Sequence, residues 1–120
     1  YGNWKDDLYK KYLNTINFGV LPYGVNDFTN TTNFNKYYDF LKSGIPVITS
    51  DTKPMSRLNK QLECGITINV DSICDIKESI KELYISDYEA LSTNAYKAYK
   101  ERYNWSVDEK KLLQYLKEVI

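Results

Sequence analysis

The stretch NFNKYYDFLKSGIPVITSD, residues 33–51, predicts a helix, a glycine stop and a buried strand in immediate succession. Residues 35–43 carry apolar side chains at the spacing of one helical face, and Gly44 follows as a left-handed residue that ends the helix. Residues 45–48 form a continuous apolar run, which is typical of a strand in a parallel sheet covered on both faces. A helix that leads straight into such a strand is part of an α/β repeat.

The same alternation continues on both sides of this stretch. Strands are expected over residues 18–21 and 66–70, and helices over residues 4–13, 54–63, 73–83, 86–102 and 106–120. Ser86 and Ser106 each begin a capping-box pattern, which predicts a helix start at each of them. We therefore expect an α/β fold, a partial Rossmann-like domain with a short parallel sheet of about three strands flanked by helices. Further helices follow at the C-terminus, and one edge of the sheet is expected to be exposed.

The composition excludes several classes of function. The chain has 16 basic and 16 acidic residues, so its net charge gives no argument for nucleic acid or for an anionic membrane surface. It has no histidine, which excludes histidine-based acid–base catalysis and histidine metal sites. No apolar run reaches the ~20 residues of a membrane span, and the first residues lack the apolar core of a secretory signal.

Two further features have simple interpretations. Cys64 and Cys74 have no metal or redox spacing, so we expect reduced, structural thiols in a cytoplasmic protein. The run KAYKERYNW, residues 97–105, combines basic and aromatic side chains in the way of some nucleic-acid-binding segments. Acidic residues lie on both sides of it, so a solvated helix end is the favoured interpretation, and no nucleic-acid partner is expected.

Ligands of open α/β sheets bind beyond the carboxyl ends of the strands. The loop over residues 23–34 and the turn over residues 49–53 both follow a predicted strand. Lys36 lies in the first turn of the central helix, where the helix dipole disfavours a cation, and Asp39 follows one turn later on the same side. A cation, a carboxylate and the N–H groups of a helix start suit a phosphate attached to a sugar diol.

Simpler alternatives exist for each of these features. Lys36 can be a solvated lysine, and Asp39 can form a surface ion pair with Lys36 or Lys42, which contributes little to stability. The long loop can be a tolerated surface insertion. The aromatic side chains of the central helix are more often part of a core than a stacking platform.

Three segments resemble the C-terminal domain of GT-B glycosyltransferases, which have two Rossmann-like domains, and in particular their group 1, family 4-like members. NFNKYYDFLKSGIPVITSD is similar to the family's N-P-x-K-x-x-E-Y-L-A-x-G-x-P-V-V, and INFGVLPYGVN to its a-D-I-G-L-x-P strand. NAYKAYKERYNWSVDEKKLLQYL is similar to the family's ending, N-A-x-x-x-x-x-x-Y-S-W followed by L-L-x-x-Y. The resemblance implies that residues 1–120 are a single domain, the C-terminal portion of the donor-binding domain, with the N-terminal acceptor domain absent.

The resemblance also implies roles for individual residues. Lys36 would contact the phosphates of the donor, Asp39 would take the place of the family's ribose-binding glutamate, and Asn35 would line the pyrophosphate. The nucleotide-sugar-binding residues expected in this way are Tyr23, Asn33, Phe34, Asn35, Lys36 and Asp39. No metal, no cofactor and no catalytic residue is expected in this chain, because the acceptor site and the base belong to the N-terminal domain.

The implied function is transfer of a hexosyl group from a nucleotide sugar, uridine-linked, to a saccharide, lipid or protein acceptor in polysaccharide biosynthesis. The implied location is the cytoplasm, including the inner face of the cell membrane. The sequence departs from the family's pattern at three positions. Asp39 stands where the family usually has Glu, Phe34 stands where Pro is common, and Asn17 stands where Asp is common. Thr31 stands where retaining enzymes have the first of two paired glutamates, so the stereochemical outcome stays open. The alternative is a non-catalytic α/β interaction module that has lost the ligand site, and a phosphoacceptor receiver domain ranks below both.

Overall fold

The computed structural model describes residues 6–120. The elements follow in the order α1 (Asp6–Leu13), β1 (Gly19–Leu21), η1 (Thr29–Thr31), α2 (Asn35–Lys42), β2 (Val47–Ser50), α3 (Lys53–Leu62), β3 (Gly65–Ile68), α4 (Ile73–Ile85), α5 (Tyr88–Glu101) and α6 (Trp105–Val119). The strands form one parallel sheet in the order β1-β2-β3. The prediction of an α/β fold with a short parallel sheet, flanking helices and C-terminal helices is confirmed. Residues 4 and 5 of the first expected helix lie outside the described residues.

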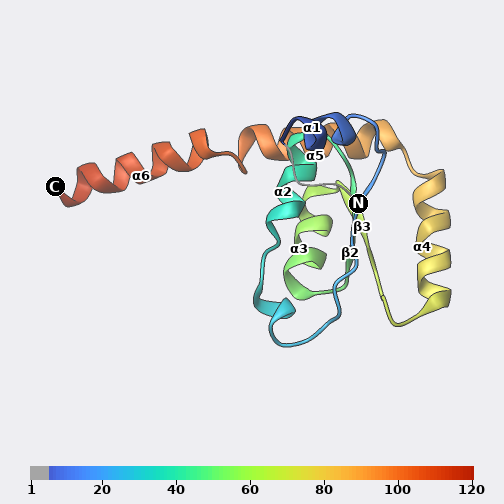
Figure 1. Cartoon of the computed structure of the whole chain (residues 1–120). Coiled ribbons are helices and arrows are strands. Elements are labelled where there is room, and N and C mark those ends of the chain that lie inside the picture. The colour runs from blue at the N-terminus through green and yellow to red at the C-terminus, as the bar shows by residue number, and fades with distance from the viewer. Residues whose placement is uncertain (1–5) are drawn as a thin grey trace.

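The helices cover the sheet from two sides (Figure 1). Helices α2 and α3 lie on one side and α4 on the other, while α5 crosses one end of the layers. The core lies between the sheet and the first group of helices, and consists of Leu21, Tyr37, Leu41, Val47, Met55, Leu58, Cys64, Ala95 and Ala98. Within the described sheet β1 pairs only with β2, and its Val20 is half exposed. The expected exposed edge is therefore present at β1.

The central strand begins two residues later than its apolar run suggests. The N–H of Ile45 donates to the carbonyl oxygen of Phe40 at 3.0 Å, so Ile45 belongs to the end of α2 rather than to the ladder. Pro46 has no N–H to donate, although its carbonyl accepts the N–H of Gly19 at 2.9 Å. The ladder with β3 therefore starts at Val47. The strand expected over residues 45–48 is present, but both of its ends lie two residues later, at Val47 and Ser50.

This shift changes the predicted ligand-facing turn over residues 49–53. Thr49 and Ser50 are strand residues and are 0% and 1% exposed. The hydroxyl of Ser50 donates to the carbonyl oxygen of Leu21 at 3.2 Å, so it holds β1 to β2 instead of facing a ligand. The turn between β2 and α3 contains only Asp51 and Thr52.

The helix ends show where local rules hold. Gly44 has a φ of +64°, so the predicted left-handed residue after α2 is confirmed. The predicted starts at Ser86 and Ser106 are wrong: Asp87 caps α5 and Asn104 caps α6, each accepting a backbone N–H three residues later. Ser86 instead closes the preceding helix, because its hydroxyl donates to the carbonyl oxygen of Leu83 at 2.6 Å.

Helix α6 continues away from the rest of the protein (Figure 1). None of its residues is buried, and its apolar side chains Leu112, Leu113, Leu116 and Val119 remain 45–81% exposed. Across residues 6–120, every helix is too short or too polar to cross a membrane. The amphipathic side of α6 is thus without a partner in the part of the chain that the structure describes.

Candidate functional site

The loop between β1 and α2 is folded upon itself. The hydroxyl of Thr29 donates to the carbonyl oxygen of Gly24 at 2.8 Å and accepts the N–H of Asn26 at 2.9 Å. The side-chain oxygen of Asn26 accepts the N–H of Thr29 at 3.0 Å. Thr29 is only 6% exposed, so these bonds organise the loop from within. The loop is therefore ordered by its own hydrogen bonds, and it lies at the carboxyl end of β1, where ligands of such sheets bind.

An aromatic pair leads from this loop into α2. The rings of Tyr23 and Phe34 are stacked, with centroids 3.9 Å apart and an angle of 9° between their planes. Phe34 is the N-cap residue of α2, and its side chain has no atom that can accept a hydrogen bond. In the described structure no side chain caps α2, and its first turn holds no acidic residue. The start of this helix therefore keeps its partial positive charge and its N–H groups without a capping side chain.

Lys36 and Asp39 lie on the same side of α2. The ammonium of Lys36 is 3.9 Å from a carboxylate oxygen of Asp39, and the two side chains are 47% and 46% exposed. An ion pair of this length and exposure contributes little to stability. The alternative of a surface pair is thus the observed arrangement, and both groups remain accessible from solvent. Asn35 begins the helix and is exposed as well.

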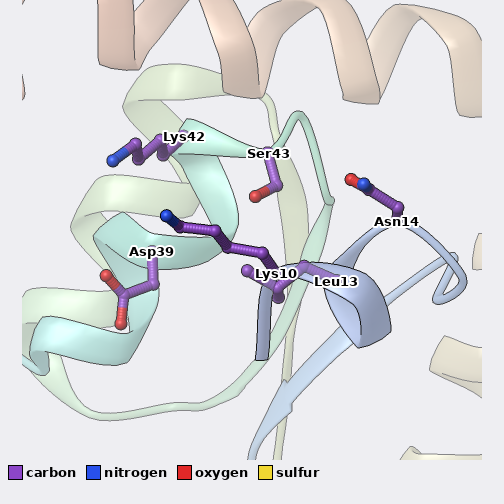
Figure 2. Close-up of a pocket in the computed structure, with 6 residues that line it drawn as sticks. All are labelled: Lys10, Leu13, Asn14, Asp39, Lys42 and Ser43. Carbon is purple, nitrogen blue, oxygen red and sulfur yellow. The ribbon is translucent and has the colours of Figure 1, made fainter. Parts of the chain in front are cut away.

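Asp39 also lines a cavity between α1 and α2 of about 340 Å³. Figure 2 shows its lining, which consists of Lys10, Leu13, Asn14, Asp39, Lys42 and Ser43. The side chain of Lys10 extends from α1 toward α2 in this view. Two ammonium groups, one carboxylate, an amide and a hydroxyl around one hollow are suited to a ligand that carries both hydroxyls and negative charge.

The sequence missed the contributions of Lys10, Asn14 and Lys42 to this cavity. Lys42 follows Asp39 at the i+3 spacing, so the helical pattern places the two on one face. Lys10 and Asn14 give no such signal, because only the packing of α1 against α2 brings them near Asp39.

Asn33 lies in a different cavity, also of about 340 Å³, between the loop and the start of α3. Its lining consists of Asn30, Thr31, Asn33, Lys53, Pro54 and Arg57. The six predicted site residues are therefore not gathered in one hollow. Asp39 and Asn33 line separate cavities, Asn35 and Lys36 lie on the exposed start of α2, and Tyr23 and Phe34 stack on each other.

The described residues do not bring three or more cysteine or acidic side chains together as a metal site. The positive charge that the two cavities offer comes from lysine and arginine side chains. Comparisons of the chain with protein-family models, with curated proteins and with solved structures found no match.

Proposed function

We propose that this chain binds the nucleoside diphosphate of a nucleotide sugar, uridine-linked, at the start of α2. One observation carries the proposal: an uncapped helix start with Lys36 in its first turn follows a folded loop at the carboxyl end of β1. Helix starts of this kind bind phosphate oxygens through their N–H groups and their dipole. A cation in the first turn is unfavourable for the helix alone, and an anionic ligand removes that disadvantage.

The geometry of α2 suggests how the other residues of the proposed site would contact the ligand. Asp39 lies three residues beyond Lys36, which is about 4.5 Å along the helix axis. A ligand with its diphosphate at the helix start brings the attached ribose toward this carboxylate, which accepts hydrogen bonds from the two hydroxyls. Lys10 and Lys42 line the cavity between α1 and α2 together with Asp39, and they add positive charge there. Asn33, Phe34 and Tyr23 would contact the ligand from the loop side.

The proposed parent activity is that of a glycosyltransferase that transfers a hexosyl group to a saccharide, lipid or protein acceptor in polysaccharide biosynthesis. In such a reaction this chain would hold the donor and stabilise the leaving diphosphate by the cation and the helix start. The base and the acceptor site would belong to a further domain of the same protein. We therefore expect no turnover by the 120 residues alone, and we place the reaction in the cytoplasm or at the inner face of the cell membrane.

A second candidate is a non-catalytic interaction module. The exposed leucines of α6 favour it, because an apolar helix side of this kind is usually covered by another protein surface. In this case Lys36 and Asp39 would serve only as the surface pair that the structure records.

A titration of the isotope-labelled chain with uridine diphosphate separates the two candidates. Donor binding should shift the amide signals of residues 23–39, and Lys36→Ala should weaken binding by about 1–3 kcal/mol, the size of a charged hydrogen bond. Lys81→Ala is the matched control, because Lys81 is also an exposed helical lysine that pairs with an acidic residue at a spacing of three, here Glu78. Absence of shifts at millimolar ligand in a folded chain would favour the interaction module, and equal losses in both variants would remove Lys36 from the site.

A further inference from the structure

The cavity between the β1–α2 loop and the start of α3 combines two cations with neutral polar groups. We call it the Arg57 cavity, and its lining consists of Asn30, Thr31, Asn33, Lys53, Pro54 and Arg57. Lys53 and Arg57 are exposed at its margin, and the lining contains no carboxylate. The chain as a whole has zero net charge, so this excess of positive charge is a local property of the cavity.

The two cations are placed at a cost to the helix that carries them. Lys53 is the first residue of α3, where the helix dipole disfavours positive charge. Arg57 follows at i+4 on the same side, and like charges at this spacing destabilise a helix by about 0.2–0.5 kcal/mol. The ion pairs recorded among residues 6–120 join other lysines to their acidic partners, and neither Lys53 nor Arg57 takes part. Departures from local preference of this kind are commonly found at functional sites.

The cavity has a fixed wall on its loop side. The N–H of Lys53 donates to the side-chain oxygen of Asn30 at 3.0 Å, across 23 residues of sequence. This bond orients the Asn30 amide, whose NH₂ group remains as a donor. Thr52, the N-cap residue of α3, is fully buried, and its hydroxyl has no hydrogen-bond partner among the described residues. The side chain of Thr52 makes no capping bond to α3, so the neutral amide of Asn30 is the side chain that the structure records at this helix start, and the positive end of the helix dipole is not neutralised by an acidic cap.

We infer that the Arg57 cavity binds a phosphate group. Arginine presents a planar fork of N–H donors that matches two phosphate oxygens, and lysine adds a second cation. The amides of Asn30 and Asn33 supply neutral donors, and the start of α3 adds its dipole. Neither Lys36 nor Asp39 lines this cavity, so it is a second anion site beside the one proposed at α2. Asn33 is shared, because it lines this cavity and is also one of the residues proposed to contact the donor.

Titration of the labelled chain with inorganic phosphate at low ionic strength tests the inference. The expected result is saturable shifts of the Lys53 amide, the Arg57 side-chain N–H and the NH₂ groups of Asn30 and Asn33. Arg57→Gln should weaken binding roughly tenfold or more, the size expected for losing a charge-assisted hydrogen bond. Lys60→Gln removes a charge from the same helix outside the cavity, so the phosphate affinity of this variant should equal that of the parent protein.

Lys53→Gln is a second variant, and circular dichroism confirms whether each variant folds. Equal phosphate affinity of the Arg57→Gln and Lys60→Gln proteins would overturn the inference, as would shifts that do not saturate. The Lys36→Ala protein keeps its phosphate affinity if the two anion sites are separate. Loss of both uridine diphosphate and phosphate binding in Lys36→Ala would instead assign a single site at α2 and overturn the Arg57 cavity.

Two sources of the phosphate group are distinguished by a second experiment. Sedimentation with phosphatidylcholine vesicles, with and without phosphatidic acid, tests a lipid headgroup. Binding that requires phosphatidic acid and is lost in Arg57→Gln assigns the headgroup. Saturable shifts with inorganic phosphate and no vesicle binding assign a soluble phosphate compound. A folded protein that binds neither vesicles nor phosphate would overturn the inference.

Discussion

The hydroxyl of Tyr37 donates a hydrogen bond of 2.9 Å to the side-chain oxygen of Asn59, which joins α2 to α3 inside the core. The amide nitrogen of Asn59 donates in turn to the hydroxyl of Thr49 at 3.0 Å and to the carbonyl oxygen of Ile66 at 2.8 Å. One side chain therefore connects both helices to two strands. The helix that carries Lys36 is held in place by this buried network, so the candidate donor site depends on it.

Asn59→Ala should reduce the free energy of unfolding by about 2–4 kcal/mol. The substitution removes the Asn59 amide from the Tyr37 hydroxyl, which keeps its contact with the Cys64 sulfur at 3.2 Å, and from the carbonyl oxygen of Ile66. Loss of a hydrogen-bond partner is costly for polar groups in the interior. Urea denaturation measures the change. Gln61→Ala, on the exposed side of the same helix, should change stability by less than about 0.5 kcal/mol. Similar values for both variants would show that the network does not stabilise the fold.

Stability should fall in alkaline solution. Burial raises the pKa of the Tyr37 hydroxyl and of the Cys64 thiol above their ordinary values of 10.0 and 9.0. Above about pH 9 the unfolded chain loses these protons while the folded chain keeps them, so the unfolded state binds fewer protons. The contribution is complete below that pH and is lost as the pH rises toward the folded pKa values.

Denaturation at about pH 7 and about pH 10 measures this effect. Tyr37→Phe should be less stable than the parent at neutral pH, because it loses the bond to Asn59, but its stability should fall less steeply with pH. A parent protein with the same stability at both values would contradict the prediction.

Gly65→Ala should destabilise the protein by about 2 kcal/mol or more. A Cβ atom at Gly65 would clash with the carbonyl oxygen of Val47, which belongs to the backbone of the neighbouring strand. The strands would have to separate, because no flexible side chain can move aside. Gly24→Ala is the control, because a Cβ atom there meets nothing within 4 Å. Thermal unfolding compares the two, and equal melting temperatures would refute the close approach of β2 and β3.

Asp39→Ala should abolish the preference for a ribose over an analogue without its hydroxyls. The measurement is the ratio of the dissociation constants for uridine diphosphate and for its 2′,3′-dideoxy analogue. Stability should change little, because the pair with Lys36 is exposed. A preference that survives the substitution would assign Asp39 to the surface pair alone.

Much of the fold is readable from local sequence. The apolar periodicity of residues 35–43 and the glycine that follows specify α2 and its end, and Gly44 has the expected positive φ. The order of helices and strands was predictable for the same reason, since periodicity and breakers act within a few residues. The capping-box predictions failed because several polar residues near a helix start can serve as the cap, and Asp87 and Asn104 do so in the structure.

The sequence by itself determined an α/β chain, the neutral charge, the absence of histidine and a helix that carries Lys36 and Asp39 one turn apart. Only the tertiary structure decided which hollow each candidate residue lines. Asp39 and Lys10 line one cavity because α1 lies beside α2, and Asn30 accepts the N–H of Lys53 because the β1–α2 loop folds onto α3. Local patterns report on neighbours within about four residues, whereas the walls of a cavity come from segments far apart in the chain.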